Sequence, residues 1–214
     1  MPGLKCDHLV VIAPDLAEGV AYVRTHLGVD LPYGGRHPEM GTHNHVLRIG
    51  EDVFLEVIAV DEDAGRPARA RWFGLDDGAA VRRAWDQGLR LRSWVARGTD
   101  LNAVLADAPE LFDDVVRVSR GDRSWRFCLP RDGSLPARGA APCVIDWGER
   151  GTPVPGMSDS GVALREFILE HPDPDAVRAL YRRMGLANPP EVRLGATLRY
   201  RACLHTPAGM VQLA

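Results

Sequence analysis

Short apolar runs that alternate with polar residues are separated by amphipathic stretches, and this order occurs three times along the chain. Residues 6–13 (CDHLVVIA) alternate as a half-buried strand does, and residues 14–28 have the spacing of an amphipathic helix that ends at a glycine. A Gly-rich stretch follows, and then two strands at residues 42–49 and 53–60 that are joined by a tight turn. The pattern predicts a βαβββ-like unit over about residues 1–60.

Two later segments, at about residues 90–148 and 162–214, have the same order. In the second unit we expect the helix to begin after Thr99 as its N-cap. The helix of the third unit, in HPDPDAVRALYRRMGL, echoes that of the first, in APDLAEGVAYVRTHLGV. Residues 61–89 connect the first two units through a charged loop and a helix, and residues 151–161 are rich in Gly, Pro and Ser, as a linker is.

A single unit of four strands would leave one sheet face and two sheet edges without partners, so we expect the units to pair. The prediction is an α+β fold in which residues 1–150 form one domain of two paired units, at about 1–60 and 90–148. The unit at residues 162–214 then follows as a third βαβββ-like module.

The composition is that of a globular protein with a sizeable core, since 45% of the 214 residues are hydrophobic and 26% are charged. The net charge of −3 is spread along the chain without a basic stripe, which argues against a nucleic-acid partner. No apolar run is as long as a membrane span, and the first residues lack the apolar core of a signal peptide. We therefore expect a cytoplasmic protein with no membrane partner.

The cysteines also favour the cytoplasm. None belongs to a C-x-x-C pair, and each lies in an apolar, strand-like run, which predicts buried free thiols rather than disulfides or a zinc site. The four are Cys6, Cys128, Cys143 and Cys203.

Two polar side chains interrupt apolar strands of the first unit. His8 lies in the first strand and Glu56 in the last, each on a face that is otherwise apolar. A buried carboxylate without a partner costs several kcal/mol, so Glu56 needs a cation, a proton or a hydrogen-bond partner. A metal ion would account for both residues, because imidazole and carboxylate are natural ligands. The alternative is structural: His8 donates to a backbone carbonyl, and Glu56 pairs with Arg48 or Arg71.

The second unit offers one further candidate ligand. Aligning its last strand with that of the first unit places Asp146 at the position of Glu56. Aligning APDL of the first unit with GTDL of the second places Ser93 at the position of His8, and serine is a poor metal ligand.

The motifs DHLVVIAPDL, GGRHPEMGTHN, FLEVIAV, WVARGTDL and PCVIDWG together resemble the vicinal oxygen chelate superfamily, and within it the glyoxalase-like domain group, over about residues 5–148. The resemblance implies two βαβββ modules that form a cup-shaped barrel of mixed sheet. It also implies a divalent metal at the base of the cup, bound by first-strand and last-strand residues of both modules. Substrates of the superfamily chelate that metal through adjacent oxygens.

Carried over to this chain, the resemblance makes His8, Glu56 and Asp146 the ligands of a divalent metal such as Ni, Zn, Mn or Fe. Ser93 departs from the pattern and argues against an extradiol dioxygenase, which needs two histidines and one carboxylate. The expected function is a metal-assisted lyase, isomerase or hydrolase that acts on a small oxygen-rich metabolite. The alternative is a metal-free protein that binds or sequesters small molecules in the same cup.

The third module leaves two possibilities open. It can cover a sheet or make a contact in a homodimer. If it instead paired with the first module, Glu166 and Gln212 would join His8 and Glu56, a set similar to the ligands of glyoxalase I.

The loop GGRHPEMGTHNH and several aromatic residues supply further candidates. A two-residue turn at Glu51 and Asp52 would turn His43 to the face of Glu56, where it would be a general base. A three-residue turn would instead turn Asn44 and Val46 inward, and the sequence leaves this register open. The candidate substrate-binding residues are Arg36, Asn44, Trp72, Trp94 and Trp125.

Overall fold

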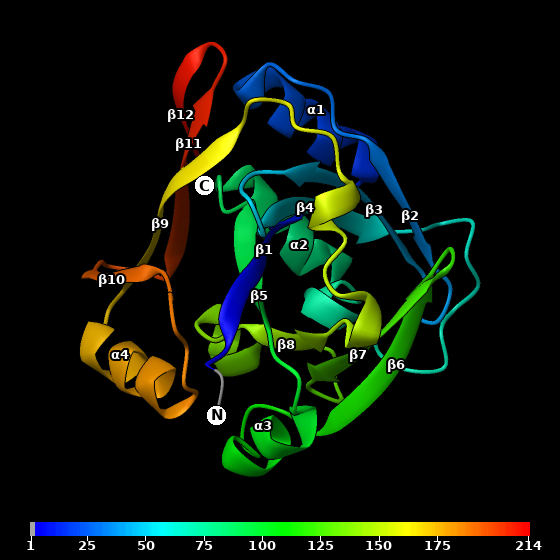
Figure 1. The fold of residues 1–214 in the computed structure, drawn as a ribbon, viewed down its shortest axis with the longest axis vertical. Helices are drawn as coiled ribbons and strands as arrows, with labels where there is room; N and C mark the ends of the chain where they lie inside the picture. Colours follow the sequence, from blue (N-terminus) through cyan, green and yellow to red (C-terminus); the bar gives the residue numbers. More distant parts are fainter. Residues whose placement is uncertain (1–2) are drawn as a thin grey trace.

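The computed structural model describes residues 3–214 and has the expected α+β architecture. Eight strands form one mixed sheet in the order β2-β3-β4-β1-β5-β8-β7-β6, and this sheet curves into a cup. A second sheet of four strands, in the order β10-β9-β11-β12, stands beside it (Figure 1).

Each half of the large sheet comes from one βαβββ module. The first module consists of β1 (Lys5–Ile12), α1 (Leu16–Leu27), β2 (Tyr33–His37), β3 (Thr42–Arg48) and β4 (Phe54–Val60). The short turn η1 (Trp72–Gly74) and helix α2 (Gly78–Asp86) connect it to the second module. The second module consists of β5 (Leu91–Arg97), α3 (Leu101–Asp107), β6 (Asp114–Arg120), β7 (Arg123–Leu129), the turn η2 (Pro136–Gly139) and β8 (Cys143–Asp146). The turns η3 (Gly148–Arg150) and η4 (Val154–Gly156) lead out of it.

The two modules pair through their first strands. β1 lies parallel to β4 of its own module, where His8 is opposite Phe54, and antiparallel to β5 of the second module, where His8 is opposite Val95. At the far ends of the sheet, β2 and β6 approach one another (Figure 1). Gly34 and Gly35 of β2 leave room there for the side chain of Arg120, which a Cβ at Gly35 would meet at 2.8 Å.

The third segment repeats the element order but not the strand order. It consists of β9 (Ala163–His171), α4 (Pro174–Arg183), β10 (Glu191–Leu194), β11 (Arg199–Thr206) and β12 (Gly209–Leu213). Its first strand, β9, lies between β10 and β11, whereas β1 pairs with the last strand of its module. Glu166 is therefore opposite Cys203 in the small sheet, and Gln212 lies on its edge strand β12. The alternative ligand set with His8 and Glu56 is not formed.

Local sequence explains where the helices begin and end. The side chain of Asp15 caps α1 by accepting from the backbone N–H of Glu18, and Gly28 ends the helix in the left-handed region at φ 67°. In α3 the capping residue is Asp100, which accepts from the backbone of Ala103. The expectation of Thr99 as N-cap was wrong by one residue, because the carboxylate of Asp100 outcompetes the neighbouring hydroxyl for that position.

Two apolar clusters stabilise the fold. One fills the cup between the faces of the large sheet. The other lies between the outside of that sheet, α1 and the third module, and Trp94 at its centre contacts Phe167 and Tyr181. The four cysteines are free, and no helix within residues 3–214 is long and apolar enough to cross a membrane.

Candidate functional site

A β-bulge in β1 sets the orientation of His8. The register between β1 and β5 shifts between Cys6 and His8, so Asp7 has no opposite residue on β5. Bulges of this kind re-aim side chains and are common beside active sites. Asp7 is completely buried, and both it and His8 take part in one polar cluster at the base of the cup.

The carboxylate of Asp7 holds the imidazole in place. One oxygen lies 2.7 Å from Nδ1 of His8, and the other accepts from the indole N–H of Trp147 at 3.0 Å. Arg97 is 3.4 Å from the same second oxygen and balances its charge. Because Nδ1 is engaged by Asp7, the free nitrogen Nε2 is the one that faces Glu56.

Glu56 completes the cluster from β4. Its Oε2 is 3.5 Å from Nε2 of His8, and its Oε1 accepts from the side-chain amide of Asn44 at 2.5 Å. The amide oxygen of Asn44 in turn accepts from the guanidinium of Arg120 at 3.2 Å. A polar chain thus runs from Asp7 at the base of the cup to Arg120 where β2 and β6 meet.

The charges of His8 and Glu56 depend on each other. Burial by itself lowers the pKa of His8, but hydrogen bonds and charge interactions with Asp7 and Glu56 outweigh it and raise that pKa to about 9. Burial by itself raises the pKa of Glu56, but the hydrogen bond and charge of His8 lower that pKa to about 2. At neutral pH the pair is an imidazolium beside a carboxylate.

Aromatic side chains enclose this pair. The cavity that His8 and Glu56 line has a volume of about 20 Å³, room for one water-sized group. His37 lines it too, and burial lowers the pKa of His37 to about 4, so its ring is neutral at pH 7. The aromatic residues of the wall are Phe54, Trp72, Phe73, Trp125, Phe127 and Trp147.

A family whose description is "glyoxalase-like domain" matches residues 6–185 of the sequence. The chain belongs to the glyoxalase-like domain family. The predicted resemblance to this group of the vicinal oxygen chelate superfamily is therefore confirmed. No functionally curated protein matches the sequence.

Several solved structures align with this glyoxalase-like protein. A hypothetical protein from Staphylococcus aureus aligns with a TM-score of 0.62 and 14% identity, over 99% of this chain and 98% of that one. A methylmalonyl-CoA epimerase from Mycobacterium tuberculosis aligns with a TM-score of 0.41 and 17% identity, over 67% of this chain and 85% of that one. A variant of the Streptomyces coelicolor epimerase aligns with a TM-score of 0.42 and 18% identity, over 71% of this chain and 99% of that one.

The structure brings some of the predicted site residues of this glyoxalase-like domain together. Ile49 and Val53 are hydrogen-bonded across a three-residue turn, which fixes the register that turns Asn44 toward Glu56. Trp72 and Trp125 lie in the wall of the cavity.

Other predicted residues lie elsewhere. The same register turns His43 to the opposite face of β3, where it lines a groove beside α1 with Arg36. Arg36 is exposed and pairs with Asp61 and Asp63. Trp94 is buried on the outside of the large sheet against the third module, so it does not line the cup.

The predicted ligands of a divalent metal are not gathered at one point. Asp146 accepts from the guanidinium of Arg126 and from the backbone N–H of Gly148, and the cup-facing residue of β8 is its neighbour Ile145. Ser93 lies opposite Val10, while the residue opposite His8 is the apolar Val95.

A protein site for such a metal needs at least three donors. Among residues 3–214 no three His, Cys, Asp or Glu side chains are placed to hold an ion together. His8, His37 and Glu56 of the first module line the cavity but are not placed to hold one ion together, and the second module adds the guanidinium of Arg120 and apolar side chains. The residues present do not fit a divalent metal ion.

Four residues that shape the site were not among the candidate site residues: Asp7, His37, Arg120 and Trp147. The position of Asp7 next to a histidine in an apolar strand could have indicated a site residue. Regular strand alternation, however, places Asp7 on the face opposite His8. Arg120 gave no signal, because only closure of the sheet between β2 and β6 brings it to Asn44.

Proposed function

We propose that this glyoxalase-like protein is an enzyme of the isomerase or lyase type that moves a proton on a small, anionic, oxygen-rich molecule without a metal ion. The observation that carries the proposal is the buried pair of His8 and Glu56, 3.5 Å apart at the base of an aromatic cup. A cationic acid and an anionic base that face each other in a water-poor cavity are the parts that general acid–base catalysis requires.

In the proposed reaction, Nε2–H of His8 donates to a carbonyl oxygen of the substrate. The carboxylate of Glu56 takes a proton from the adjacent carbon, and the electron pair of that C–H bond moves onto the oxygen. His8 stabilises the enolate as it forms, in the way that a preorganised donor does. Return of the proton to the carbon or loss of a leaving group would complete an isomerisation or an elimination.

Insertion of a substrate would also strengthen the base. The low pKa of Glu56 comes from its contact with His8, so a ligand oxygen that takes the hydrogen bond of His8 would let that pKa rise. A carboxylate whose pKa is nearer to the working pH is a better proton acceptor.

Two donors near the pair support an anionic substrate. Arg120 is half-buried, which lowers its pKa, and it pairs with no carboxylate among residues 3–214. The indole N–H of Trp72 is buried and has no acceptor within the same residues. A buried donor without an acceptor is costly, so an oxygen-rich ligand would satisfy the indole N–H of Trp72. The negative charge of such a ligand would also pair with Arg120, which donates to the neutral amide oxygen of Asn44.

The test uses a panel of small 2-oxo and 2-hydroxy acids in deuterium oxide. Proton NMR measures how fast the carbon-bound hydrogen of each compound is replaced by deuterium. We expect the protein to exchange the carbon-bound hydrogen of at least one compound, equally well with and without a chelator. Glu56→Gln should slow the exchange about 100-fold or more. Glu51→Gln, in the exposed turn before β4, is the matched control and should leave the rate unchanged.

Exchange that appears only after a divalent metal is added would contradict the metal-free proposal and favour the metal-assisted reaction instead. Absence of exchange together with saturable quenching of tryptophan fluorescence would favour a second function, a small-molecule-binding protein. The aromatic wall of the cavity supports that second candidate, because planar ligands stack on such surfaces.

A further inference from the structure

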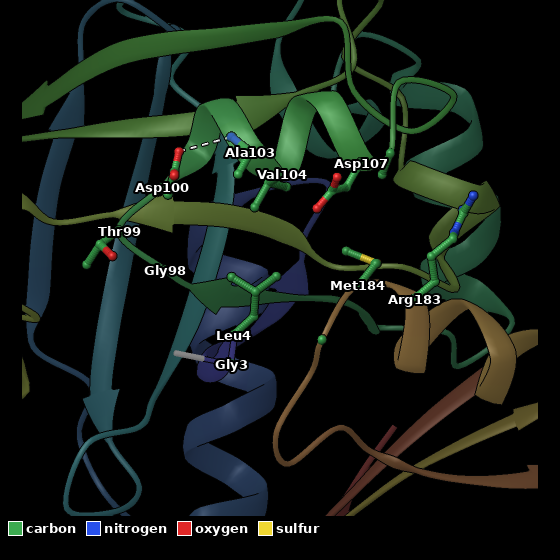
Figure 2. A pocket seen from close by; sticks show the side chains of 12 residues that line it. Gly3, Leu4, Gly98, Thr99, Asp100, Ala103, Val104, Asp107, Arg183 and Met184 are labelled. Carbon is green, nitrogen blue, oxygen red and sulfur yellow. Dashed lines mark hydrogen bonds between the residues drawn. The ribbon is translucent and has the colours of Figure 1, made fainter. Parts of the chain in front are cut away.

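A larger hollow lies away from His8, between α3 and the end of α4. It has a volume of about 290 Å³ and is formed where the third module meets the second (Figure 2). We call it the junction pocket and define it by Gly3, Leu4, Gly98, Val104, Asp107 and Met184, which are among its lining residues. Pockets of small-molecule size often form where two structural units meet.

Backbone hydrogen bonds hold the two sides of the junction pocket together. The N–H of Leu4 donates to Gly185 at 3.0 Å, and the N–H of Ala187 donates to Leu4 at 2.8 Å. The side chain of Leu4 forms one wall, with Val104 of α3 and Met184 after α4 around it (Figure 2). These walls are apolar and suit a hydrocarbon or aromatic body.

The polar groups around the junction pocket are predominantly acidic. Asp107 stands in the last turn of α3, and its carboxylate lies between Val104 and Met184 (Figure 2). A negative charge at the C-terminal end of a helix is unfavourable, and no basic residue offsets it in the last turn of α3. Arg183 also lines the pocket, but its guanidinium pairs with Glu110.

Asp107 itself has no ion-pair partner within residues 3–214, and Asp100 adds a second carboxylate at the other end of α3. A ligand with a positive charge could therefore pair with the carboxylate of Asp107 while its apolar part contacts the apolar walls of the pocket. An anionic ligand would be repelled by the same groups.

We propose that the junction pocket is a second binding site, separate from the cup, for a small organic cation with an apolar body. The cationic group pairs with Asp107, and the apolar body contacts Leu4, Val104 and Met184. This inference does not depend on the proposed reaction at His8 and Glu56.

The test compares three probes of one size, phenethylammonium, 2-phenylethanol and 3-phenylpropionate, by chemical-shift titration of the full-length protein. We expect phenethylammonium to bind most tightly, with the largest shifts in α3 and after α4. Removing the charge by Asp107→Asn should weaken the binding of phenethylammonium about fivefold, which is the effect expected from the loss of one partly exposed ion pair. Glu62→Gln, in the loop after β4, is the matched control and should not change the affinity.

A second variant keeps the proposal testable if Asp107→Asn perturbs α3. Ala103→Leu should fill the junction pocket and abolish binding while α3 keeps its helical signals, since leucine is a good helix former. Equal affinity for all three probes, or unchanged affinity in Asp107→Asn, would overturn the assignment of a cation site. Shifts confined to the tryptophans of the cup would overturn the location.

Discussion

Asp7 and His8 are consecutive residues of β1, yet their side chains are hydrogen-bonded to each other, with 2.7 Å between Oδ1 and Nδ1. Consecutive side chains of a regular strand point to opposite faces, so this contact requires the bulge between Cys6 and His8. The bulge gives the histidine a fixed ring orientation and a buried negative partner.

Replacing Asp7 with Asn should lower the pKa of His8 from about 9 toward its ordinary value of 6.5, because the charge of Asp7 and its hydrogen bond raise it. The raised pKa of His8 stabilises the fold fully below pH 6.5, and this contribution is lost as the pH rises through 9. Asp7→Asn should therefore flatten the decline of stability between these pH values. NMR titration of His8 and urea unfolding at pH 6.5 and 9 measure the two effects.

Asp52→Asn is the control for this prediction, because Asp52 is exposed and pairs with Arg97 without touching His8. It should leave the titration of His8 in place. An unchanged pKa of His8 in Asp7→Asn would show that Glu56 alone sets the charge of the ring.

His37 should govern stability on the acid side. Burial lowers its pKa from 6.5 to about 4, so the unfolded chain binds a proton in this range that the folded protein excludes. Stability should fall as the pH drops from 6.5 to 4, by up to about 3 kcal/mol at about 1.4 kcal/mol per pH unit. Urea unfolding of the wild type and of His37→Gln across this range provides the measurement. The variant, which does not titrate there, should lose less stability, and equal slopes would contradict the assignment.

Gly34→Ala should displace Asn44 from Glu56. A Cβ at residue 34 would stand 2.3 Å from the amide oxygen of Asn44 and 3.1 Å from the guanidinium of Arg120. Forcing extra volume into such a contact costs about 1–3 kcal/mol. Urea unfolding should give a lower midpoint with an unchanged slope. Gly78→Ala, at a helical glycine with nothing within 4 Å of its added Cβ, is the matched control and should be neutral or stabilising.

The docking of the third module should depend on two buried hydroxyls. Tyr200 donates to the carbonyl of Gly139 at 2.7 Å, and Tyr181 donates to that of Ala140 at 2.7 Å. Tyr200→Phe leaves a buried carbonyl with one donor fewer and should cost about 1–3 kcal/mol of unfolding free energy. Tyr33→Phe, at an exposed position, is the control and should not change the free energy of unfolding measurably. Equal stability of Tyr200→Phe and Tyr33→Phe would refute a role of the hydroxyl in docking.

Periodicity predicted the repeated modules and their pairing well, because each long strand carries its own alternating pattern. The strand β2 was hidden by its glycines, which have no side chain to show alternation, and β10 is only Glu191–Leu194. The strand order of the third module could not be predicted from element order, because β9 pairs with β10 and β11 through backbone pairing that the side-chain pattern does not specify.

The sequence was most informative about the site where a polar residue interrupted an apolar strand. His8 and Glu56 are polar residues in apolar runs, and the structure places them together. Asp7 depended on a bulge, Asn44 on the length of a turn, and Arg120 on closure of the sheet. Asp146 was a candidate because the repeat alignment placed it at the position of Glu56, but in the structure it bonds to Arg126 while its neighbour Ile145 lies in the cup.

Trp94 is shared by the back of the large sheet and the third module, where it contacts Phe167 and Tyr181. A hydrogen bond at the last residue also joins the two parts, since the carbonyl of Ala214 accepts from the backbone N–H of Arg90 at 3.2 Å. Cutting the chain in the linker at residues 151–161 would therefore expose the side chain of Trp94. The first 150 residues would then carry an exposed apolar patch that is prone to aggregation. The first 150 residues carry the acid–base pair, but we expect them to aggregate when they are expressed alone. A shortened version of this protein therefore has to keep the third module, including its last strand.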